Sequence, residues 1–261
     1  MATSEVSARS KPKSVTLDDE RVLPDSADRA TFLAHLARYE FVLPMIKPCN
    51  DVLETACGAG YGTHRISQHA HSVVAIDYSP LALTYARERY AAPNLHYLQM
   101  DCHRLAFANA AFDLVVSFEV FEHLERPHEY AAECARVLRP GGRLVLSTPN
   151  RAAWELHMSS IQQEYEFHSS MVNVDELRAC LQPQFSSVQL YGQRRRGGQL
   201  YSLLRALDPW NLRLRLFPPK ARGQLQRQMG VATPEQKQTG AWVFSKSQLR
   251  QCNHFVAVCT R

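Results

Sequence analysis

The residues of this chain that could carry chemistry begin with a glycine-rich turn after a short apolar stretch. The turn reads Cys57-Gly-Ala-Gly-Tyr-Gly62, and Glu54 lies four residues before its first glycine. Glycines allow a tight turn and let a ligand approach the backbone without a Cβ in the way. Asp77 ends the next apolar stretch, where its carboxylate can accept hydrogen bonds from two ribose hydroxyls. The combination indicates a site for a ribose-containing ligand.

A second group of polar residues follows the apolar stretch Phe112–Phe118. Glu119, Glu122 and His123 stand at i, i+3 and i+4, so a helical turn would place all three on one face. His123 could be a general base that takes a hydroxyl proton, since an unperturbed imidazole has a pKa near ~6.5. Alternatively, the three residues could hold a divalent cation that lowers the pKa of an acceptor hydroxyl. In a third, structural interpretation, Glu119 only lines the ligand site and His123 caps the following turn.

The elements that must position these residues alternate between strands and helices. Predicted strands cover Asp51–Ala56, Ser72–Asp77, Leu95–Met100, Phe112–Phe118 and Arg143–Thr148, and predicted helices cover Thr63–His69, Leu81–Tyr90 and His128–Leu138. Pro80 can open a helix at its first position, and Pro140-Gly-Gly142 can end one. Such alternation is typical of an α/β fold with an open parallel sheet, in which ligands bind at the carboxyl ends of the strands.

Both ends of the chain depart from this alternation. After residue 150 we predict a helix over Asp175–Leu181 and strands over Ser187–Tyr191 and Phe255–Thr260. The connection between those two strands is far longer than the usual ~2–6 residues, so it is predicted to be an insertion. The predicted organisation is a flexible tail (1–20), an N-terminal helical cover (21–48), a core (49–192 plus 252–261) and a basic insertion or lid (193–251).

Composition limits the class of protein. The chain has 261 residues, of which 45% are hydrophobic, and a formal net charge of +5, which is typical of a globular protein. Its seven cysteines include no Cys-x-x-Cys pair, so neither a disulfide framework nor a zinc ribbon is indicated. No stretch has the length of a signal peptide or a membrane span. We therefore expect a soluble, cytoplasmic protein.

The order of the motifs resembles that of the class I (Rossmann-like) S-adenosylmethionine-dependent methyltransferases. The resemblance covers residues 38–191 and the final strand, and its motifs are Glu54–Gly62, Asp77, Asp101-Cys102 and Leu138–Gly142. It implies a seven-stranded, mostly parallel sheet of order 3-2-1-4-5-7-6 with an antiparallel last strand, and S-adenosyl-L-methionine as the cofactor. A dinucleotide dehydrogenase fits less well, because the turn lacks the last glycine of G-x-G-x-x-G.

The resemblance also implies roles for individual residues. Gly58 and Gly60 would face the cofactor, Asp77 would bind its ribose, and Asp101 with Cys102 would contact its adenine. Arg38, on the helical cover, could reach the methionine carboxylate or close the pocket, or could simply be a surface residue. The complete expected set is Arg38, Glu54, Gly58, Gly60, Asp77, Tyr78, Asp101, Cys102 and Phe118.

Glu119-x-x-Glu-His123 resembles the metal-binding segment of ubiquinone-pathway O-methyltransferases and of small-RNA 2′-O-methyltransferases. In the latter a further histidine completes the site, and His168 is the candidate here. The tentative ligand set for Mg²⁺ is Glu119, Glu122, His123 and His168. Many relatives with the same Glu-His pair use no metal, so the metal site and the His123 general base remain alternatives.

The expected reaction is methyl transfer to a hydroxyl oxygen of a small molecule. The segments around Arg38, the glycine-rich turn and Glu119 resemble bacterial methyltransferases of saccharides and natural products. Nine basic residues and one acid lie between 194 and 227, which suits an anionic acceptor or a membrane surface; a solvated basic face is the plainer alternative. Nucleic acid is not favoured, because no RNA-binding module is visible. N-methylation and a non-catalytic cofactor-binding subunit remain the alternative functions.

Overall fold

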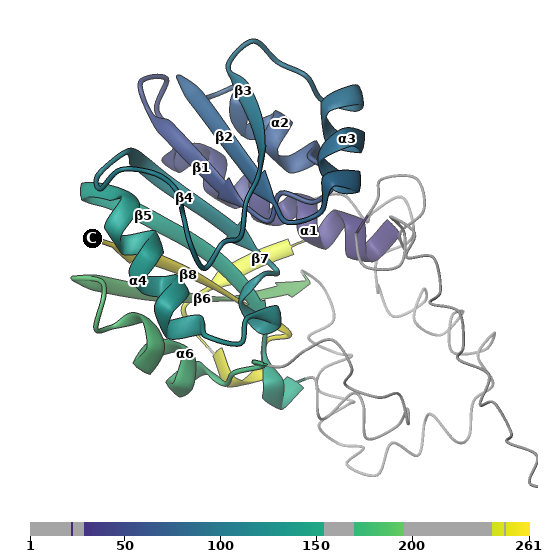
Figure 1. Cartoon of the computed structure of the whole chain (residues 1–261). Coiled ribbons are helices and arrows are strands. Elements are labelled where there is room, and N and C mark those ends of the chain that lie inside the picture. Colours follow the sequence, from purple (N-terminus) through teal and green to yellow (C-terminus); the bar gives the residue numbers. More distant parts are fainter. Residues whose placement is uncertain (1–21, 23–28, 154–169, 196–241, 248) are drawn as a thin grey trace, which may run out of the picture.

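A twisted sheet organises the computed structural model of the chain, which describes Val22 and residues 29–153, 170–195, 242–247 and 249–261 (Figure 1). Its strands are β1 (Asp51–Thr55), β2 (Ser72–Asp77), β3 (Leu95–Gln99), β4 (Phe112–Phe118), β5 (Leu138–Pro149), β6 (Ser187–Arg195), β7 (Trp242–Ser245) and β8 (His254–Thr260). Strands β1 to β5 pair in parallel, whereas β8 runs antiparallel to both β5 and β6. The mostly parallel sheet with an antiparallel last strand is thus confirmed.

The strand order is β3-β2-β1-β4-β5-β8-β6-β7, which gives eight strands where seven were predicted. The first seven positions have the predicted order, with β8 as the predicted last strand. The additional strand, β7, pairs antiparallel with Gly192–Arg195 of β6 and lies within the predicted insertion. A four-residue strand is too short to show periodicity, and its pairing partner is the part of β6 that extends beyond the predicted end at Tyr191.

Helices cover both faces of the sheet (Figure 1). The described helices are α1 (Arg29–Val42), α2 (Tyr61–Ser67), α3 (Pro80–Arg89), α4 (Pro127–Val137) and α6 (Val174–Leu181), with 3-10 turns at Leu43–Met45, Phe121–His123 and Leu249–Gln251. One apolar cluster joins the sheet to α4 and α6, and a second joins it to α1, α2 and α3. β4 is almost entirely buried between the two clusters, which explains its nearly continuous apolar sequence.

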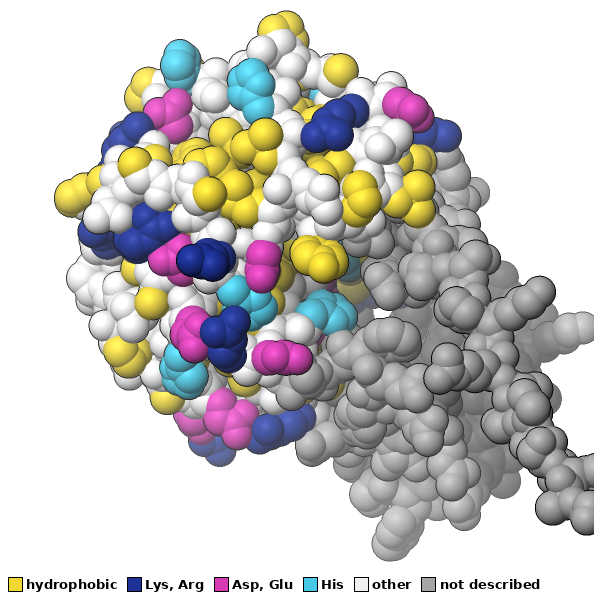
Figure 2. Space-filling view, in the orientation of Figure 1, with side chains coloured by type: hydrophobic (Ala, Val, Ile, Leu, Met, Phe, Trp, Pro, Cys, Tyr) yellow, Lys and Arg dark blue, Asp and Glu magenta, His cyan; other side chains and the backbone are white. Residues whose placement is uncertain are grey.

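Local sequence signals account for where several helices begin. Ser79 caps α3 by accepting a hydrogen bond from the backbone of Ala82, and Pro80 occupies the first turn. Asn173 and Glu176 form a reciprocal capping box at the start of α6. No helix lies between β3 and β4 in the chain. On the face of the molecule drawn in Figure 2, hydrophobic side chains gather over β1 to β3, and charged and histidine side chains are mixed beside α4.

The topology brings the polar residues that follow the strands to one edge of the sheet. The carboxyl ends of β1 to β5 share this edge, and antiparallel β8 begins there, because His254 pairs with Pro149 at the end of β5. None of the described helices is long and apolar enough to cross a membrane. The tail 1–20, His168 and insertion residues 196–241 lie outside the described residues, so the predictions made for them stay predictions.

Candidate functional site

The candidate site lies where the strand order reverses, between β1 and β4. Just beyond these adjacent strands, Ala56 has φ 50° and Glu119 has φ 54°. Left-handed backbone costs a residue with a Cβ about 1–2 kcal/mol, so the surrounding structure must hold both residues in place. The sheet edge at a reversal of strand order is also where open α/β sheets bind ligands. Both observations identify the same edge as functionally constrained.

The glycine-rich turn between β1 and α2 packs tightly against its neighbours. Gly58 has φ 55°, and its N–H donates to Oδ2 of Asp77 at 2.8 Å. Gly60 has φ 80°, and a Cβ there would lie 2.6 Å from the Cβ of Ala86 and 2.9 Å from the hydroxyl oxygen of Tyr97. The sequence suggested that Gly60 is small so that a ligand can approach, but packing against α3 and β3 already requires a glycine.

Asp77 places a buried carboxylate at the end of β2. It accepts hydrogen bonds from the N–H groups of Gly58, at 2.8 Å, and Ser79, at 2.9 Å. An ionised carboxylate offers about four lone-pair sites, so a carboxylate can accept hydrogen bonds from hydroxyl groups as well as from N–H groups. Tyr78 follows immediately, and its side chain is 78% exposed. The end of β2 therefore presents a fixed carboxylate next to an uncovered aromatic ring.

Glu54 is fully buried and connects α1 to α2. Its carboxylate accepts hydrogen bonds from the Tyr39 hydroxyl, at 2.7 Å, and from the Thr63 hydroxyl. Burial raises the pKa of Glu54 to about 7, although these two hydrogen bonds oppose the shift. The Tyr39 ring also packs edge-on against Phe118, with ring centroids 5.1 Å apart. Glu54 and Phe118, both predicted to contact the cofactor, therefore also anchor α1 to the sheet through their contacts with Tyr39.

Asp101 and Cys102 lie at the start of the β3–β4 loop. Asp101 accepts hydrogen bonds from the backbone N–H of His103, at 2.9 Å, and pairs with its Nδ1 at 3.0 Å. These hydrogen bonds lower the pKa of Asp101, whereas burial raises the pKa of Cys102 to about 12. The loop thus offers an ionised acceptor beside a neutral thiol.

Glu119, just after β4, is the centre of a cluster of polar side chains from three elements. Its Oε1 accepts a hydrogen bond from the Ser147 hydroxyl at 2.7 Å and lies 3.2 Å from Nη1 of Arg38. Its Oε2 lies 3.2 Å from Nε2 of His254. Burial favours the neutral acid, but the charge of Arg38 and the hydrogen bond with His254 hold the pKa of Glu119 well below its usual value. Glu119 is therefore an ionised carboxylate shared between α1, β5 and β8.

Arg38 is buried, so the interpretation of it as a surface residue is wrong. Its side chain is 1% exposed, and Nε donates to the side chain of Gln193 at 2.7 Å. Gln193 in turn donates to the carbonyl of Ala34 on α1 at 2.8 Å. Within the described part of the chain, Nη1 of Arg38 has no hydrogen-bond partner despite the nearby charge of Glu119. This buried donor matches an anionic ligand group.

The three predicted metal ligands that the structure describes, Glu119, Glu122 and His123, do not converge. Glu119 lies before the 3-10 turn Phe121–His123, and its left-handed backbone directs its carboxylate toward β5 and β8. Glu122 is buried against the Thr148 hydroxyl, whereas His123 is 48% exposed and lies 4.0 Å from Glu122. Burial and the charge of Glu119 raise the pKa of Glu122 well above its usual value.

Among the described residues, three ligand atoms lie within 4.8 Å of one another only at Asp101, Cys102 and His103. Asp101 is exposed, and such groups are common without an ion, so we assign no metal to this group either. The predicted Mg²⁺ is therefore not supported, because one helical turn does not bring Glu119, Glu122 and His123 to one face.

Sequence reasoning missed His254. The antiparallel last strand was predicted from Phe255, and a strand of that direction must begin at the ligand edge of the sheet. The residue just before it could thus have been identified from topology alone. The contact between His254 and Glu119 could not be predicted from local sequence patterns, because the two residues are 135 positions apart.

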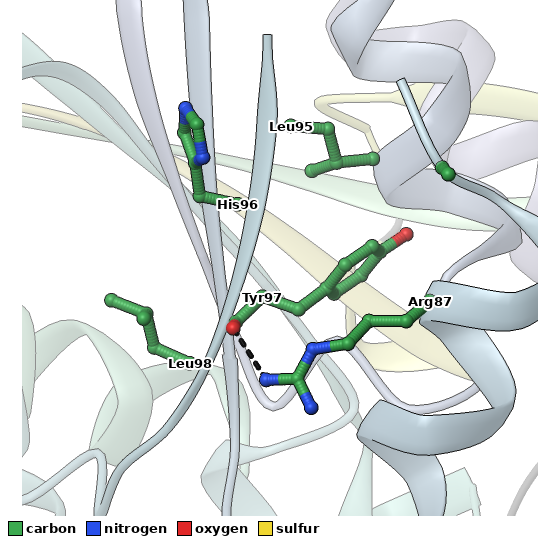
Figure 3. A pocket seen from close by; sticks show the side chains of 6 residues that line it. Arg87, Leu95, His96, Tyr97 and Leu98 are labelled. Carbon is green, nitrogen blue, oxygen red and sulfur yellow. Dashed lines mark hydrogen bonds between the residues drawn. The ribbon is translucent and has the colours of Figure 1, made fainter. Parts of the chain in front are cut away.

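A pocket of about 300 Å³ lies away from this edge, against β3 and α3 (Figure 3). It is lined by Arg87, Ala91, Leu95, His96, Tyr97 and Leu98. The guanidinium of Arg87 donates to the carbonyl of Tyr97 at 2.6 Å, so this cation is engaged by backbone. No predicted site residue lines this pocket, and the site is defined by the strand ends instead.

Proteins and structures similar to this chain include methyltransferases. Residues 53–146 match a family of methyltransferase domains. A probable S-adenosylmethionine-dependent methyltransferase of Mycobacterium tuberculosis is 37% identical over 171 residues, which are 65% of this chain and 61% of that protein. A ubiquinone biosynthesis O-methyltransferase of Xanthomonas axonopodis is 29% identical over 69% of this chain and 76% of that protein. The chain thus spans less than two thirds of the length of the Mycobacterium tuberculosis relative.

Solved structures show the same fold. A putative methyltransferase of Haloferax volcanii, in complex with the Trm112 methyltransferase activator, superposes with a TM-score of 0.59 at 17% identity. The superposition covers 89% of this chain and 92% of that one. Residues 53–146 therefore match a methyltransferase domain, the fold is that of Rossmann-like methyltransferase structures, and the chain is similar in sequence to S-adenosylmethionine-dependent methyltransferases.

Proposed function

We propose that this chain binds S-adenosyl-L-methionine at the carboxyl ends of β1, β2 and β4 and transfers its methyl group to a hydroxyl oxygen. The observation that carries the proposal is the buried carboxylate of Asp77, which accepts the N–H of Gly58 from the glycine-rich turn. This contact fixes the carboxylate beside a turn that a ligand can approach closely. A ribose with two neighbouring hydroxyls is the ligand group that this arrangement suits.

The surrounding residues fit the other parts of that cofactor. Nη1 of Arg38, which is ion-paired with Glu119 but makes no hydrogen bond among the described residues, would bind the methionine carboxylate, and the exposed ring of Tyr78 would pack on the adenine. Asp101 would accept a hydrogen bond from the adenine amino group, with Cys102 beside it. When bound, the cofactor supplies an electrophilic methyl group on a sulfonium, and the protein needs to supply position and a proton acceptor.

Positioning is the main contribution that we propose for the protein. Tyr39 and Arg38, both on α1, contact Glu54 and Glu119 at the ends of two adjacent strands. The helix therefore closes over the edge where both substrates would meet and restricts water there. Holding two reactants in contact within a closed site can replace much of the entropy cost of a bimolecular reaction.

We propose a saccharide or natural product as the acceptor. The support is the relative described as an O-methyltransferase and the basic character of residues 194–227, which suits an anionic small molecule. N-methylation is the alternative reaction, and analysis of the methylated product separates the two. A non-catalytic subunit is the alternative role, which would bind the cofactor but release no S-adenosylhomocysteine with any acceptor. The seven free cysteines support a cytoplasmic location.

Equilibrium binding tests the cofactor assignment. Titration calorimetry with S-adenosylhomocysteine should give saturable binding to the full chain, which Asp77→Ala should weaken. Hydrogen bonds to a charged group contribute about 1.5–3 kcal/mol each, so losing two predicts a Kd about 100-fold higher or more. Asp77→Asn should give a smaller loss, and Asp175→Ala, at a carboxylate on α6, should bind normally. Equal affinity of Asp77→Ala and the unmodified chain, at matched melting temperatures, would refute the proposed ribose contact.

A further inference from the structure

The first residue of β8 is a histidine held at the ligand edge of the sheet. Nε2 of His254 lies 3.2 Å from Oε2 of Glu119, and its side chain is 27% exposed. Pro149 and Gln193 flank it in the sheet, at the ends of β5 and β6 that also face this edge. The imidazole is thus bound to an ionised carboxylate while part of it remains accessible.

Two other histidines lie close to the site. Burial and the charge of Arg38 lower the pKa of His35 to about 3, so His35 does not accept a proton near neutral pH. His123 is half-exposed, and its Nε2 lies 4.0 Å from Glu122, a carboxyl group whose pKa is raised by burial. The carboxylate beside His254 is different, because the charge of Arg38 lowers the pKa of Glu119 and keeps it ionised.

We infer that His254 is the general base for methyl transfer and that Glu119 fixes its tautomer. Because Glu119 contacts Nε2, that nitrogen carries the hydrogen of the neutral imidazole, and Nδ1 keeps its lone pair. Nδ1 is then the atom that can accept a proton from the acceptor hydroxyl. This inference rests on the proposed function and replaces His123 with His254 in the catalytic role.

Methyl transfer to the acceptor hydroxyl involves two bond changes and one proton transfer. The acceptor oxygen forms a bond to the methyl carbon, the carbon–sulfur bond breaks, and its electron pair stays on sulfur. The hydroxyl proton moves to Nδ1 of His254, and the resulting imidazolium is stabilised by the charge of Glu119. Arg38 and the Ser147 hydroxyl contact the other oxygen of Glu119, so that the carboxylate stays ionised and aligned with Nε2. The products are a methyl ether and a neutral thioether.

The tautomer can be measured without knowing the acceptor. ¹⁵N-histidine NMR of the full chain bound to S-adenosylhomocysteine should show a His254 imidazole protonated at Nε2 and bare at Nδ1, with the signal assigned by its loss in His254→Gln. Glu119→Gln should weaken this preference. His71, which is 71% exposed at the opposite end of β2, is the internal control. A His254 imidazole with hydrogen on Nδ1 would overturn the inference.

Steady-state kinetics with an acceptor that the unmodified chain methylates test the general base directly. His254→Gln should lower kcat by about 10²–10⁴-fold, the usual contribution of a general base, while the Kd for S-adenosylhomocysteine changes less than about threefold. His71→Gln should leave both values unchanged. Retention of kcat within about threefold in His254→Gln would refute the role of His254. Failure of the unmodified chain to bind S-adenosylhomocysteine would instead refute the proposed function, so the two failures are distinguishable.

Discussion

The ion pair between Arg38 and Glu119 should stabilise the fold strongly, because it holds α1 over the strand ends. The two side chains are 1% and 15% exposed, so the cost of breaking a buried pair applies, rather than the ~0–1 kcal/mol of a surface pair. Arg38→Met leaves the carboxylate of Glu119 without its cation and the side chain of Gln193 without its donor. We expect it to lower the free energy of unfolding by about 3–5 kcal/mol.

A double-mutant cycle measures the interaction itself. Arg38→Met, Glu119→Gln and the double variant should be compared by urea unfolding of the full chain at pH 7. The folded-state pKa of Glu119 lies below its unfolded value, so its stabilisation is fully present at pH 7 and is lost as the pH falls through the folded value. We expect the double variant to lose about 1–3 kcal/mol less than the sum of the single losses.

The exposed pair Arg126–Glu129, with side chains 59% and 57% exposed, is the matched control. The same cycle on this pair should give a coupling below about 1 kcal/mol. If the Arg38–Glu119 cycle is additive within about 0.5 kcal/mol, the pair does not fasten the helical cover and the reasoning is refuted.

Three further variants or conditions test other parts of the site. Gly60→Ala should lower the free energy of unfolding, measured in urea, by about 2–4 kcal/mol, because residue 60 has φ 80° and an added Cβ would clash with Ala86. A loss below about 0.5 kcal/mol would contradict this packing argument. The pKa of Glu54, about 7 in the folded chain, lies above its unfolded value, so folded Glu54 keeps a proton that unfolded Glu54 loses. The free energy of unfolding should therefore fall by about 3 kcal/mol as the pH rises from the unfolded pKa of Glu54 through its folded value of about 7. Glu54→Gln should remove that part of the pH dependence, and an unchanged pH profile in Glu54→Gln would contradict the assigned pKa. Mg²⁺ and EDTA should leave the melting temperature unchanged, because Glu119, Glu122 and His123 do not converge; a rise of several degrees with Mg²⁺ would show otherwise.

The parts of the site that could be predicted from the sequence are those set by local turns. Gly58 and Asp77 lie where strand–turn–helix spacing places them, since Asp77 ends β2 and Gly58 lies in the turn after β1, two strands that the apolar pattern reveals. The burial of Arg38 was not predictable, because it depends on Gln193, 155 residues away. The direction of Glu119 was predicted wrongly for a local reason: a left-handed residue interrupts the assumed helical turn.

The measurement that tests the central claim most directly is the calorimetric titration of the unmodified chain with S-adenosyl-L-methionine. We predict saturable binding with one site per chain, and competition by S-adenosylhomocysteine. Absence of detectable heat and of competition at cofactor concentrations up to about 1 mM, where even weak binding near −4 kcal/mol would be seen, would contradict the proposed function.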